Sequence, residues 1–235
     1  YYRNSIIMQL KIFSEKLLAE INRANNILLN IHKNPDLDSV GSACAMAEVL
    51  SQLGKKVTIV SPGPVDKQFS FIKGYETIKN INFDTFDYSP YDLFILLDVS
   101  SFDRVTGSKK VALPNNLNYA VIDHHKSNRF TFPLRHVNED AHSTTQILYE
   151  LFCAWNVVVT PHVATALYAG LAGDTVHFRY MNNAQNVFQV AQNLLSLGAD
   201  HDVYMKNIYS SYEAAYLKLL GTFLEKMEVV EMKNN

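Results

Sequence analysis

Residues 26–39 decide the fold, and they read Asn26-Ile27-Leu28-Leu29-Asn30-Ile31-His32-Lys33-Asn34-Pro35-Asp36-Leu37-Asp38-Ser39. The first six residues form a short apolar run between polar residues, a pattern that predicts a strand. A helix is expected to begin at Ser39 and to continue to Leu53, where Gly54 stands in the usual helix-ending position. A strand that leads through a polar loop into a helix is the first unit of an α/β sheet.

The same alternation continues along the first half of the chain. Further apolar strands are expected at residues 56–60, 92–97 and 119–122, and a helix is expected over residues 6–24. Buried strands that alternate with helices predict an α/β fold, with helices on both faces of a largely parallel sheet. The second half is predicted to be helical, over residues 143–155, 161–173, 184–197 and 211–227.

The composition excludes several classes of protein. The chain has 235 residues, of which 48% are hydrophobic and 19% are charged, and its formal net charge is -2. This hydrophobic content rules out a disordered tail, and the near-neutral charge gives no basic surface for gripping long duplex DNA. Two cysteines, Cys44 and Cys153, argue against a disulfide scaffold and favour the cytoplasm. The apolar runs are too short to cross a membrane, and no leader sequence is recognised.

Acidic and histidine side chains gather where the expected strands and one apolar helix end. There are four such groups: His32 with Asp36 and Asp38, Asp98, Asp123-His124-His125, and Asp174. In an open parallel sheet the carboxyl ends of neighbouring strands face one crevice, where ligands bind. The sequence therefore predicts that these side chains converge on one site.

Crowded carboxylates repel each other, and a pair of divalent cations resolves that conflict. The mixture of carboxylate and imidazole without thiol favours Mn²⁺, Mg²⁺ or a similar hard ion over structural zinc. Two such ions, roughly 3.5–4 Å apart, would polarise a phosphoryl group and generate hydroxide from bound water. Hydrolysis of a phosphate ester is the chemistry that fits this arrangement best.

Four motifs, taken in order, resemble those of the DHH phosphoesterase superfamily. They are His32 through Ser42, Asp98 with Asp103-Arg104, Asp123-His124-His125, and Gly170 through Asp174-Thr175. Residues 123–128, 137–138 and 143–145 are most similar to the bacterial nano-RNases that also dephosphorylate adenosine 3′,5′-bisphosphate. The resemblance implies a Mn²⁺-dependent hydrolase of short oligoribonucleotides, of this bisphosphate, or of both.

The resemblance also implies a role for each residue of the motifs. The metal ligands would form two sets that share a bridging Asp98: His32 and Asp36 for the first ion, and Asp38, His124 and Asp174 for the second. His125 would orient the scissile phosphate or stabilise its charge. Asp123 would fix the orientation and tautomer of a histidine. Arg104 would either contact the phosphate or brace the metal loop, and the sequence leaves both open.

The start of the second helix allows two interpretations. Ser39, Gly41 and Ser42 would bind a substrate anion on free backbone N–H groups, with Gly41 permitting close approach. Alternatively, Ser39 is an ordinary N-cap. Together with His125 and Arg104, these three residues are the expected substrate contacts.

The family's C-terminal substrate domain, with its Gly-Gly-Gly-His run, is not found in this sequence. Residues 1–200 are therefore interpreted as the catalytic domain, and residues 201–235 as a helical connector to a substrate-binding domain outside this chain. Alternatives with the same metal centre are a cyclic or linear di-adenylate phosphodiesterase, an inorganic pyrophosphatase and a RecJ-type single-strand exonuclease. A nucleotide-sensing module is the non-enzyme alternative, and a homodimer is left open.

Overall fold

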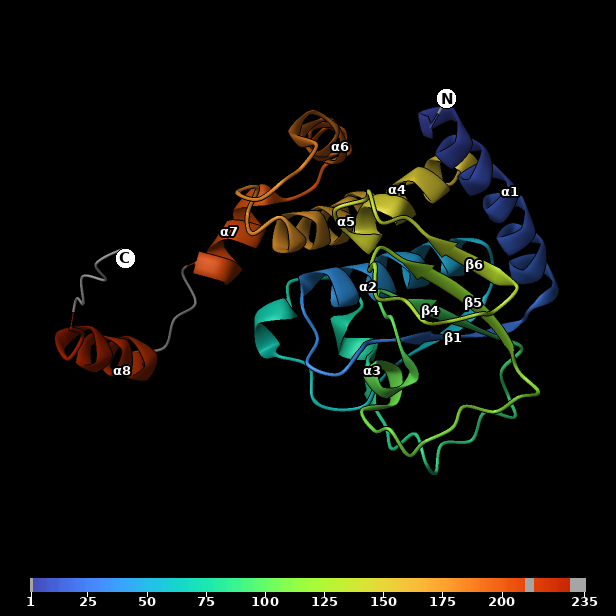
Figure 1. The fold of residues 1–235 in the computed structure, drawn as a ribbon, viewed down its shortest axis with the longest axis horizontal. Coiled ribbons are helices and arrows are strands. Elements are labelled where there is room, and N and C mark those ends of the chain that lie inside the picture. Colours follow the sequence, from blue (N-terminus) through green and yellow to red (C-terminus); the bar gives the residue numbers. More distant parts are fainter. Residues whose placement is uncertain (1, 210–213, 229–235) are drawn as a thin grey trace, which may run out of the picture.

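The computed structural model describes residues 2–209 and 214–228 (Figure 1). The α-helices of this part are α1 (Tyr2–Arg23), α2 (Leu37–Gln52), α3 (Phe102–Thr106), α4 (Thr144–Trp155), α5 (Pro161–Asp174), α6 (Ala184–Ser196), α7 (His201–Tyr209) and α8 (Ala214–Glu225). The strands are β1 (Asn26–Asn30), β2 (Lys56–Ser61), β3 (Lys79–Asn80), β4 (Leu93–Leu97), β5 (Asn118–Asp123) and β6 (Leu134–Val137). Two short 3₁₀ helices, η1 (Lys67–Phe69) and η2 (Tyr75–Thr77), lie between β2 and β3.

The strands form one sheet in the order β3-β2-β1-β4-β5-β6, and each neighbouring pair is parallel. The chain starts in the middle with β1, moves out to β3, and then returns to place β4 on the other side of β1. In sheets of this kind ligands bind outside the carboxyl ends of the strands, at the point where the strand order reverses. His32 lies just after β1 and Asp98 directly follows β4, so both stand at this reversal.

Helices cover one face of the sheet. Ile27 and Leu29 of β1 and Ile95 of β4 are buried on this face, where α1, α2 and α4 pack over the strands (Figure 1). α5 packs against α2 and α4 as a further layer. α2 and α5 approach each other closely because residue 41 is glycine. A Cβ added at Gly41 would lie 2.5 Å from the backbone oxygen of Ala166.

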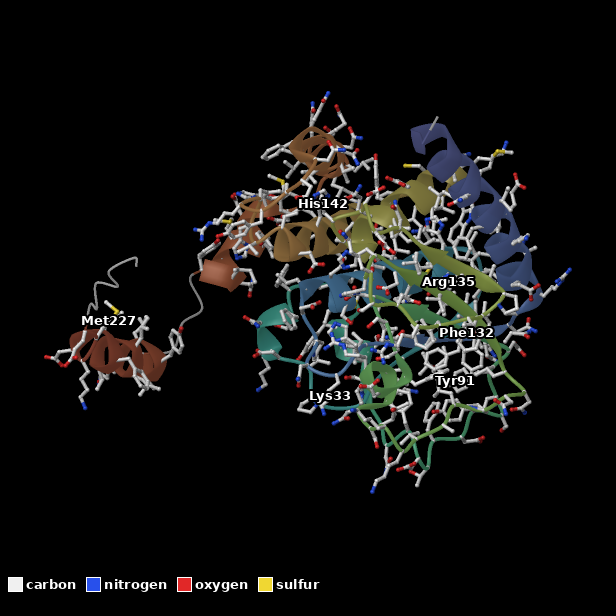
Figure 2. All side chains as sticks on the ribbon, viewed as in Figure 1. Lys33, Tyr91, Phe132, Arg135, His142 and Met227 are labelled. Carbon is white, nitrogen blue, oxygen red and sulfur yellow. The ribbon has the colours of Figure 1, made fainter. Side chains whose placement is uncertain are left out.

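The short helix α3 and long connections cover the other face. Leu28 of β1 and Phe94 of β4 are buried there in one cluster with Val105 of α3. Aromatic side chains complete this layer, and Tyr91 and Phe132 lie among them below the sheet (Figure 2). The predicted α/β fold with a parallel sheet is confirmed. Its second face, however, is covered largely by loops.

The boundaries differ from the expected ones in a few places. α2 begins at Leu37, two residues before the expected start at Ser39, because Asp36 is the N-cap and accepts a hydrogen bond from the backbone N–H of Ser39 at 2.9 Å. The sequence analysis missed β3, β6, α3 and α7. Of the helix expected over residues 211–227, residues 214–225 form α8, and residues 211–213 lie outside the described part.

No helix within the described ranges is long and apolar enough to cross a membrane. α7 packs against α5, and its Tyr204 is 1% exposed within the same core as the helices over the sheet. The division of the chain at residue 200, with a connector after it, stays a prediction.

Candidate metal centre

Side chains that lie far apart in the sequence meet at the carboxyl ends of β1, β4 and β5. They form two groups suited to hold an ion: His32 with Asp36 and Asp98, and Asp38 with His124 and Asp174. Within each group, one candidate ligand atom per residue lies within 4.8 Å of the others. The structure thus brings together all six residues that were expected to bind metal.

The loop after β1 places His32 beside two carboxylates. Its Nδ1 lies 3.0 Å from the backbone oxygen of Lys33, and a hydrogen bond donated there leaves Nε2 free to bind a ligand. Nε2 lies 3.5 Å from Oδ2 of Asp36 and 3.4 Å from Oδ2 of Asp98. Burial lowers the pKa of His32, but the contacts with both carboxylates outweigh burial and raise the pKa to about 10. Positive charge at this point, from a proton or a cation, therefore balances the carboxylates.

Asp98 stands between the two groups. It has a φ of 53°, in the left-handed region that Asp enters more readily than most residues. Its Oδ2 lies 3.4 Å from Nε2 of His32, and its Oδ1 lies 3.5 Å from Nε2 of His124. Burial raises the pKa of Asp98, but the two histidines outweigh burial and hold the pKa well below its usual range. One oxygen faces each histidine, an arrangement that suits a bridge between two ions.

Asp38 is buried and is held by the N-terminus of α4. Its carboxylate accepts hydrogen bonds from the backbone N–H groups of Thr144 and Thr145, at 2.6 and 2.9 Å, and from the Thr145 hydroxyl at 2.7 Å. Free N–H groups at the start of a helix favour negative charge. Burial nevertheless raises the pKa of Asp38, and the charges of Asp98 and Asp174 add to this effect. A cation beside Asp38 would remove that electrostatic penalty.

The sequence analysis included residues 143–145 in the family resemblance but gave Thr144 and Thr145 no role at the metal centre. Besides its contact with Asp38, Thr144 donates a hydrogen bond from its hydroxyl to Oδ1 of Asp98 at 3.1 Å, so it touches two candidate ligands. Ser143 caps α4, as the helix start in the sequence suggested. The run Ser143-Thr144-Thr145 was therefore a visible signal for a cap, but it did not reveal which carboxylate the helix would bind.

His124 provides the clearest evidence that a cation fits here. Among the described residues its buried Nε2 has no hydrogen-bond partner. Carboxylate oxygens of Asp174, Asp98 and Asp38 lie 3.1, 3.5 and 4.0 Å from this atom. Burial lowers the pKa of His124, but these three carboxylates outweigh burial and raise the pKa to about 11. An imidazole nitrogen among carboxylates, without a thiol in the group, fits a hard divalent ion such as Mn²⁺ or Mg²⁺.

His125 is held by a different carboxylate. Its Nδ1 lies 2.7 Å from Oδ1 of buried Asp123, and this hydrogen bond is the main reason that the pKa of His125 is raised. The other oxygen of Asp123 accepts a hydrogen bond from Nδ2 of Asn128 at 2.7 Å. Asp98, His124 and His125 also form a compact group, but the bond to Asp123 already occupies Nδ1 of His125. With 38% of its side chain exposed, His125 has Nε2 available for a substrate.

Arg104 reaches the same centre from α3. Its Nη2 lies 3.2 Å from Nε2 of His32. Its backbone oxygen accepts a hydrogen bond from the N–H of Lys33 at 2.8 Å. The backbone contact ties α3 to the loop after β1, which matches the bracing role. The phosphate contact stays a prediction.

The expected substrate contacts at the start of α2 are buried. The hydroxyl of Ser39 accepts a hydrogen bond from the backbone N–H of His32 at 3.2 Å, and Gly41 faces α5. The hydroxyl of Ser42 has no partner within the part of the chain that the structure describes. Ser39 and Gly41 thus support the loop and the helix contact, and the binding of substrate by these three residues stays a prediction.

Asp174 ends α5 and is followed by a strained turn. Val176, His177 and Phe178 have φ values of 49°, 59° and 64°. Left-handed backbone costs an L-residue roughly 1–2 kcal/mol, and a β-branched residue such as Val176 is rarely found there. Buried Thr175 anchors the turn, since its hydroxyl donates to the backbone oxygen of Leu171 at 2.8 Å. The turn reverses the chain directly beside a candidate ligand.

Comparisons with known proteins agree with this geometry. Residues 26–171 match the family model described as "DHH family, N-terminal domain". The chain belongs to the DHH family. The matched DHH region runs from β1 into α5 and contains five of the six candidate ligands, while Asp174 lies just beyond it.

Several curated relatives of this DHH chain are named as phosphate-hydrolysing enzymes. The "Bifunctional oligoribonuclease and PAP phosphatase NrnA" of Bacillus subtilis is 24% identical over 92% of this chain and 67% of its own length. The protein of the same name from Thermus thermophilus is 28% identical over 78% of this chain and 54% of its own length. A "Probable manganese-dependent inorganic pyrophosphatase" of Enterococcus faecalis is 27% identical over 74% of this chain and 56% of its own length. The chain thus spans about half to two thirds of these relatives.

A solved structure supports the fold. The exopolyphosphatase-related protein of Bacteroides fragilis aligns with a TM-score of 0.84 and 22% identity, over 93% of this chain and 66% of that one. The predicted resemblance to the DHH superfamily and to its nano-RNase members is confirmed. The predicted enzyme class, a hydrolase acting on phosphoric esters, is confirmed at the level of the family.

Proposed function

We propose that this DHH chain hydrolyses phosphate esters of small nucleotides with two divalent cations, Mn²⁺ foremost. The observation that carries the proposal is the position of Asp98, whose two oxygens face His32 and His124 at 3.4 and 3.5 Å. Asp36 would complete the ligands of one ion, and Asp38 and Asp174 would complete those of the other. The buried Nε2 of His124, which has no hydrogen-bond partner among the described residues, supports this assignment.

When bound, such cations neutralise charge on a phosphoryl group and lower the pKa of a coordinated water. The side chains around them hold and orient the substrate. His125, fixed by Asp123, presents Nε2–H to a phosphoryl oxygen, where a hydrogen bond strengthens as negative charge develops. Arg104 would donate hydrogen bonds from its guanidinium group to the same phosphate, since it already lies beside His32.

Short RNA and adenosine 3′,5′-bisphosphate are the proposed substrates, because two relatives are named as oligoribonuclease and PAP phosphatase. The net charge of -2 supports a small substrate, since proteins that track long strands usually have a basic groove. The pyrophosphatase of Enterococcus faecalis favours pyrophosphate as a second candidate. Free cysteines, Cys44 and Cys153, support a cytoplasmic location.

The test is an assay of the purified protein with Mn²⁺ on three substrates in parallel: a diribonucleotide, the bisphosphate and pyrophosphate. Hydrolysis of either of the first two is expected. Hydrolysis of pyrophosphate alone would establish the second candidate, and no hydrolysis with metal bound would reject the proposal. Asp98→Asn should abolish turnover, whereas Asp84→Asn, at an exposed loop position, should leave turnover unchanged. Intact cellular function of Asp98→Asn would favour a nucleotide-sensing module.

A further inference from the structure

An exposed aromatic side chain begins the short helix beside the metal centre. The chain runs from Asp98 through residues 99–101 into α3, and Phe102, the first residue of this helix, is 44% exposed. Nη2 of Arg104, two residues further on, lies 3.2 Å from Nε2 of His32. Because an α-helix rises 1.5 Å per residue, the backbone of Phe102 lies within one turn of a residue that contacts the metal centre.

The ring of Phe102 is held in place by two other aromatic rings. Its centre lies 4.9 Å from that of Phe130 and 6.0 Å from that of Phe132, and the rings of both pairs meet nearly at right angles, at 87° and 89°. Phe130 is buried, and Phe132 lies below the sheet among the aromatic side chains of that face (Figure 2). Edge-to-face pairs are favourable and have a preferred geometry. Phe102 therefore presents an ordered aromatic surface to solvent.

The position of Phe102 is what distinguishes it, because single exposed apolar side chains are common on proteins. Residues 31–36, 98–106 and 124–133 follow β1, β4 and β5, the strands whose ends carry candidate ligands. Within these three segments Phe102 is the only large apolar side chain that is exposed. The one open ring of these segments thus belongs to the loop that carries the candidate bridge between the two ions.

The loop after β5 connects this ring to His125. The backbone N–H of Asn128 donates to the backbone oxygen of His125 at 3.1 Å, which closes a turn directly after the histidine. The next residue, Arg129, donates from its backbone N–H to the backbone oxygen of Ser100 at 2.9 Å. The residue after Arg129 packs against Phe102. The expected phosphate contact and the aromatic ring therefore lie on two loops that are bonded to each other.

Two cations lie close to the ring. Asp103 directly follows Phe102, and its pKa is lowered, chiefly by a hydrogen bond with Ser101 and further by the positive charges of Lys109 and Arg129. Two positive charges thus stand against one carboxylate. A local excess of positive charge attracts the phosphate backbone of a nucleic acid. In a chain with a net charge of -2, this excess is a local feature.

We propose that Phe102 is a platform on which one base of a short RNA substrate stacks while the adjacent phosphate lies at the metal centre. Every base has an aromatic face, so a ring binds bases with little regard to their identity. Stacking on one aromatic ring strengthens the binding of a base roughly 5–150-fold. The inference rests on the proposed function and adds a base-binding position to it. Pyrophosphate, which has no base, gains nothing from this position.

A purely structural role for Phe102 leads to different expectations. If the side chain only covered Phe130, another apolar side chain of similar size would replace it. The loss of such a cover would also affect all substrates alike, whether or not they carry a base. Dependence on an aromatic side chain and dependence on a base are therefore the two properties to measure.

The test compares a diribonucleotide with two analogues, each lacking one of the two bases, as substrates of the purified chain with Mn²⁺. For the wild type, loss of one of the bases should raise KM about tenfold. Phe102→Ala should raise KM for the intact diribonucleotide by the same factor and leave KM for that analogue unchanged, because the stacked pair is already broken. Equal KM values of the wild type for all three substrates, or an unchanged KM in Phe102→Ala, would overturn the inference.

Further variants separate stacking from packing. Phe102→Tyr keeps the aromatic face and should keep KM within about twofold of the wild type, whereas Phe102→Leu keeps apolar packing on Phe130 and should raise KM as alanine does. Phe188→Ala is the matched control, since Phe188 is 53% exposed on α6 and also packs on an aromatic ring, that of Phe178. Its KM should stay unchanged. A wild-type KM in Phe102→Leu would overturn the stacking role.

A second readout does not depend on turnover. Phe102→Trp places an indole ring at the platform, and its fluorescence, followed by rapid mixing before turnover, should fall when the intact diribonucleotide binds. The wild type, with Trp155 as its single tryptophan, gives the background signal. An indole signal that does not respond to bound diribonucleotide would contradict stacking. If the wild type hydrolyses no nucleotide, the proposed function fails and the inference falls with it. Hydrolysis that is indifferent to Phe102 rejects the inference alone.

Discussion

The effect of Gly170→Ala follows directly from the contact between α5 and the metal centre. A Cβ at this position would lie 2.5 Å from Cγ2 and 2.7 Å from Oγ1 of Thr145, and 2.8 Å from Oδ1 of Asp38. These distances are far below normal contact, so the two side chains have to move. Thr145 cannot move alone, because its hydroxyl donates to Oδ1 of Asp38 at 2.7 Å. One methyl group should therefore displace a candidate metal ligand.

The change in the free energy of unfolding can be worked out from these contacts. Overpacking a tight core costs about 1–3 kcal/mol. Loss of the hydrogen bond to the Asp38 carboxylate costs about 1.5–3 kcal/mol. Replacing glycine with alanine inside a helix returns about 1 kcal/mol. Gly170→Ala should therefore destabilise the metal-free chain by roughly 1.5–5 kcal/mol.

Urea unfolding measures the loss of stability, and titration calorimetry measures the affinity for Mn²⁺. Both should fall in Gly170→Ala. Gly221→Ala is the matched control, since a Cβ there meets no atom of the described residues within 4 Å, and neither quantity should fall. If Gly170→Ala unfolds and binds Mn²⁺ like the wild type, then α5 does not constrain Asp38 and the reasoning is wrong.

Three further predictions concern the strained turn and the histidines. Val176→Gly should raise the free energy of unfolding by about 0.5–1 kcal/mol, because relief of left-handed strain exceeds the entropic cost of glycine. Urea unfolding measures this change, and a lower free energy of unfolding in the variant would contradict the prediction. His125→Ala should lower kcat about 10²–10³-fold and leave Mn²⁺ affinity unchanged, since Asp123 already occupies the Nδ1 atom of His125; weakened metal binding would show that His125 is a ligand. Binding of Mn²⁺ at pH 8 should release about two protons. Without metal the pKa values of His32 and His124 are about 10 and 11, so both side chains are protonated at this pH. Each has to lose its proton before its nitrogen can bind the ion. Affinity should then rise with pH, and a proton count near zero, from calorimetry in buffers of different ionisation heat, would contradict the assignment.

The sequence was informative where a local pattern determines the structure. The apolar run 27–31 predicts a buried strand whatever surrounds it, and His32, Asp36 and Asp38 are visible as candidate ligands because they follow that strand. The structure places these residues with Asp98, His124 and Asp174, as convergence at the strand ends implied. The strand Leu134–Val137 was missed because its four residues alternate weakly and gain their structure from β5 and α1.

Other features depend on contacts between distant segments and have no local pattern. The hydrogen bonds from Thr144 and Thr145 to Asp38 join residues more than 100 positions apart. Gly41 was interpreted as a residue for close approach of an anion, which stays a prediction; its close approach to α5 could not be seen in the sequence. The sequence indicated that Ser143 caps α4, but it suggested Ser39 as the cap of α2, where the structure has Asp36. The group that a helix start binds from another segment could not be predicted at all.

Because the folded sheet assembles the candidate ligands, binding of cations as proposed would link the stability of the protein in the cell to its supply of metal ions. The candidate ligands come from the ends of three strands, the start of α2 and the end of α5, so an unfolded chain cannot assemble them. If cations bind as proposed, every tenfold rise in free ion above the dissociation constant of a site adds about 1.4 kcal/mol to the resistance against unfolding. Depletion of manganese would then abolish catalysis and also favour unfolding, which exposes the chain to proteases. The amount of the protein in the cell would therefore depend on the supply of manganese.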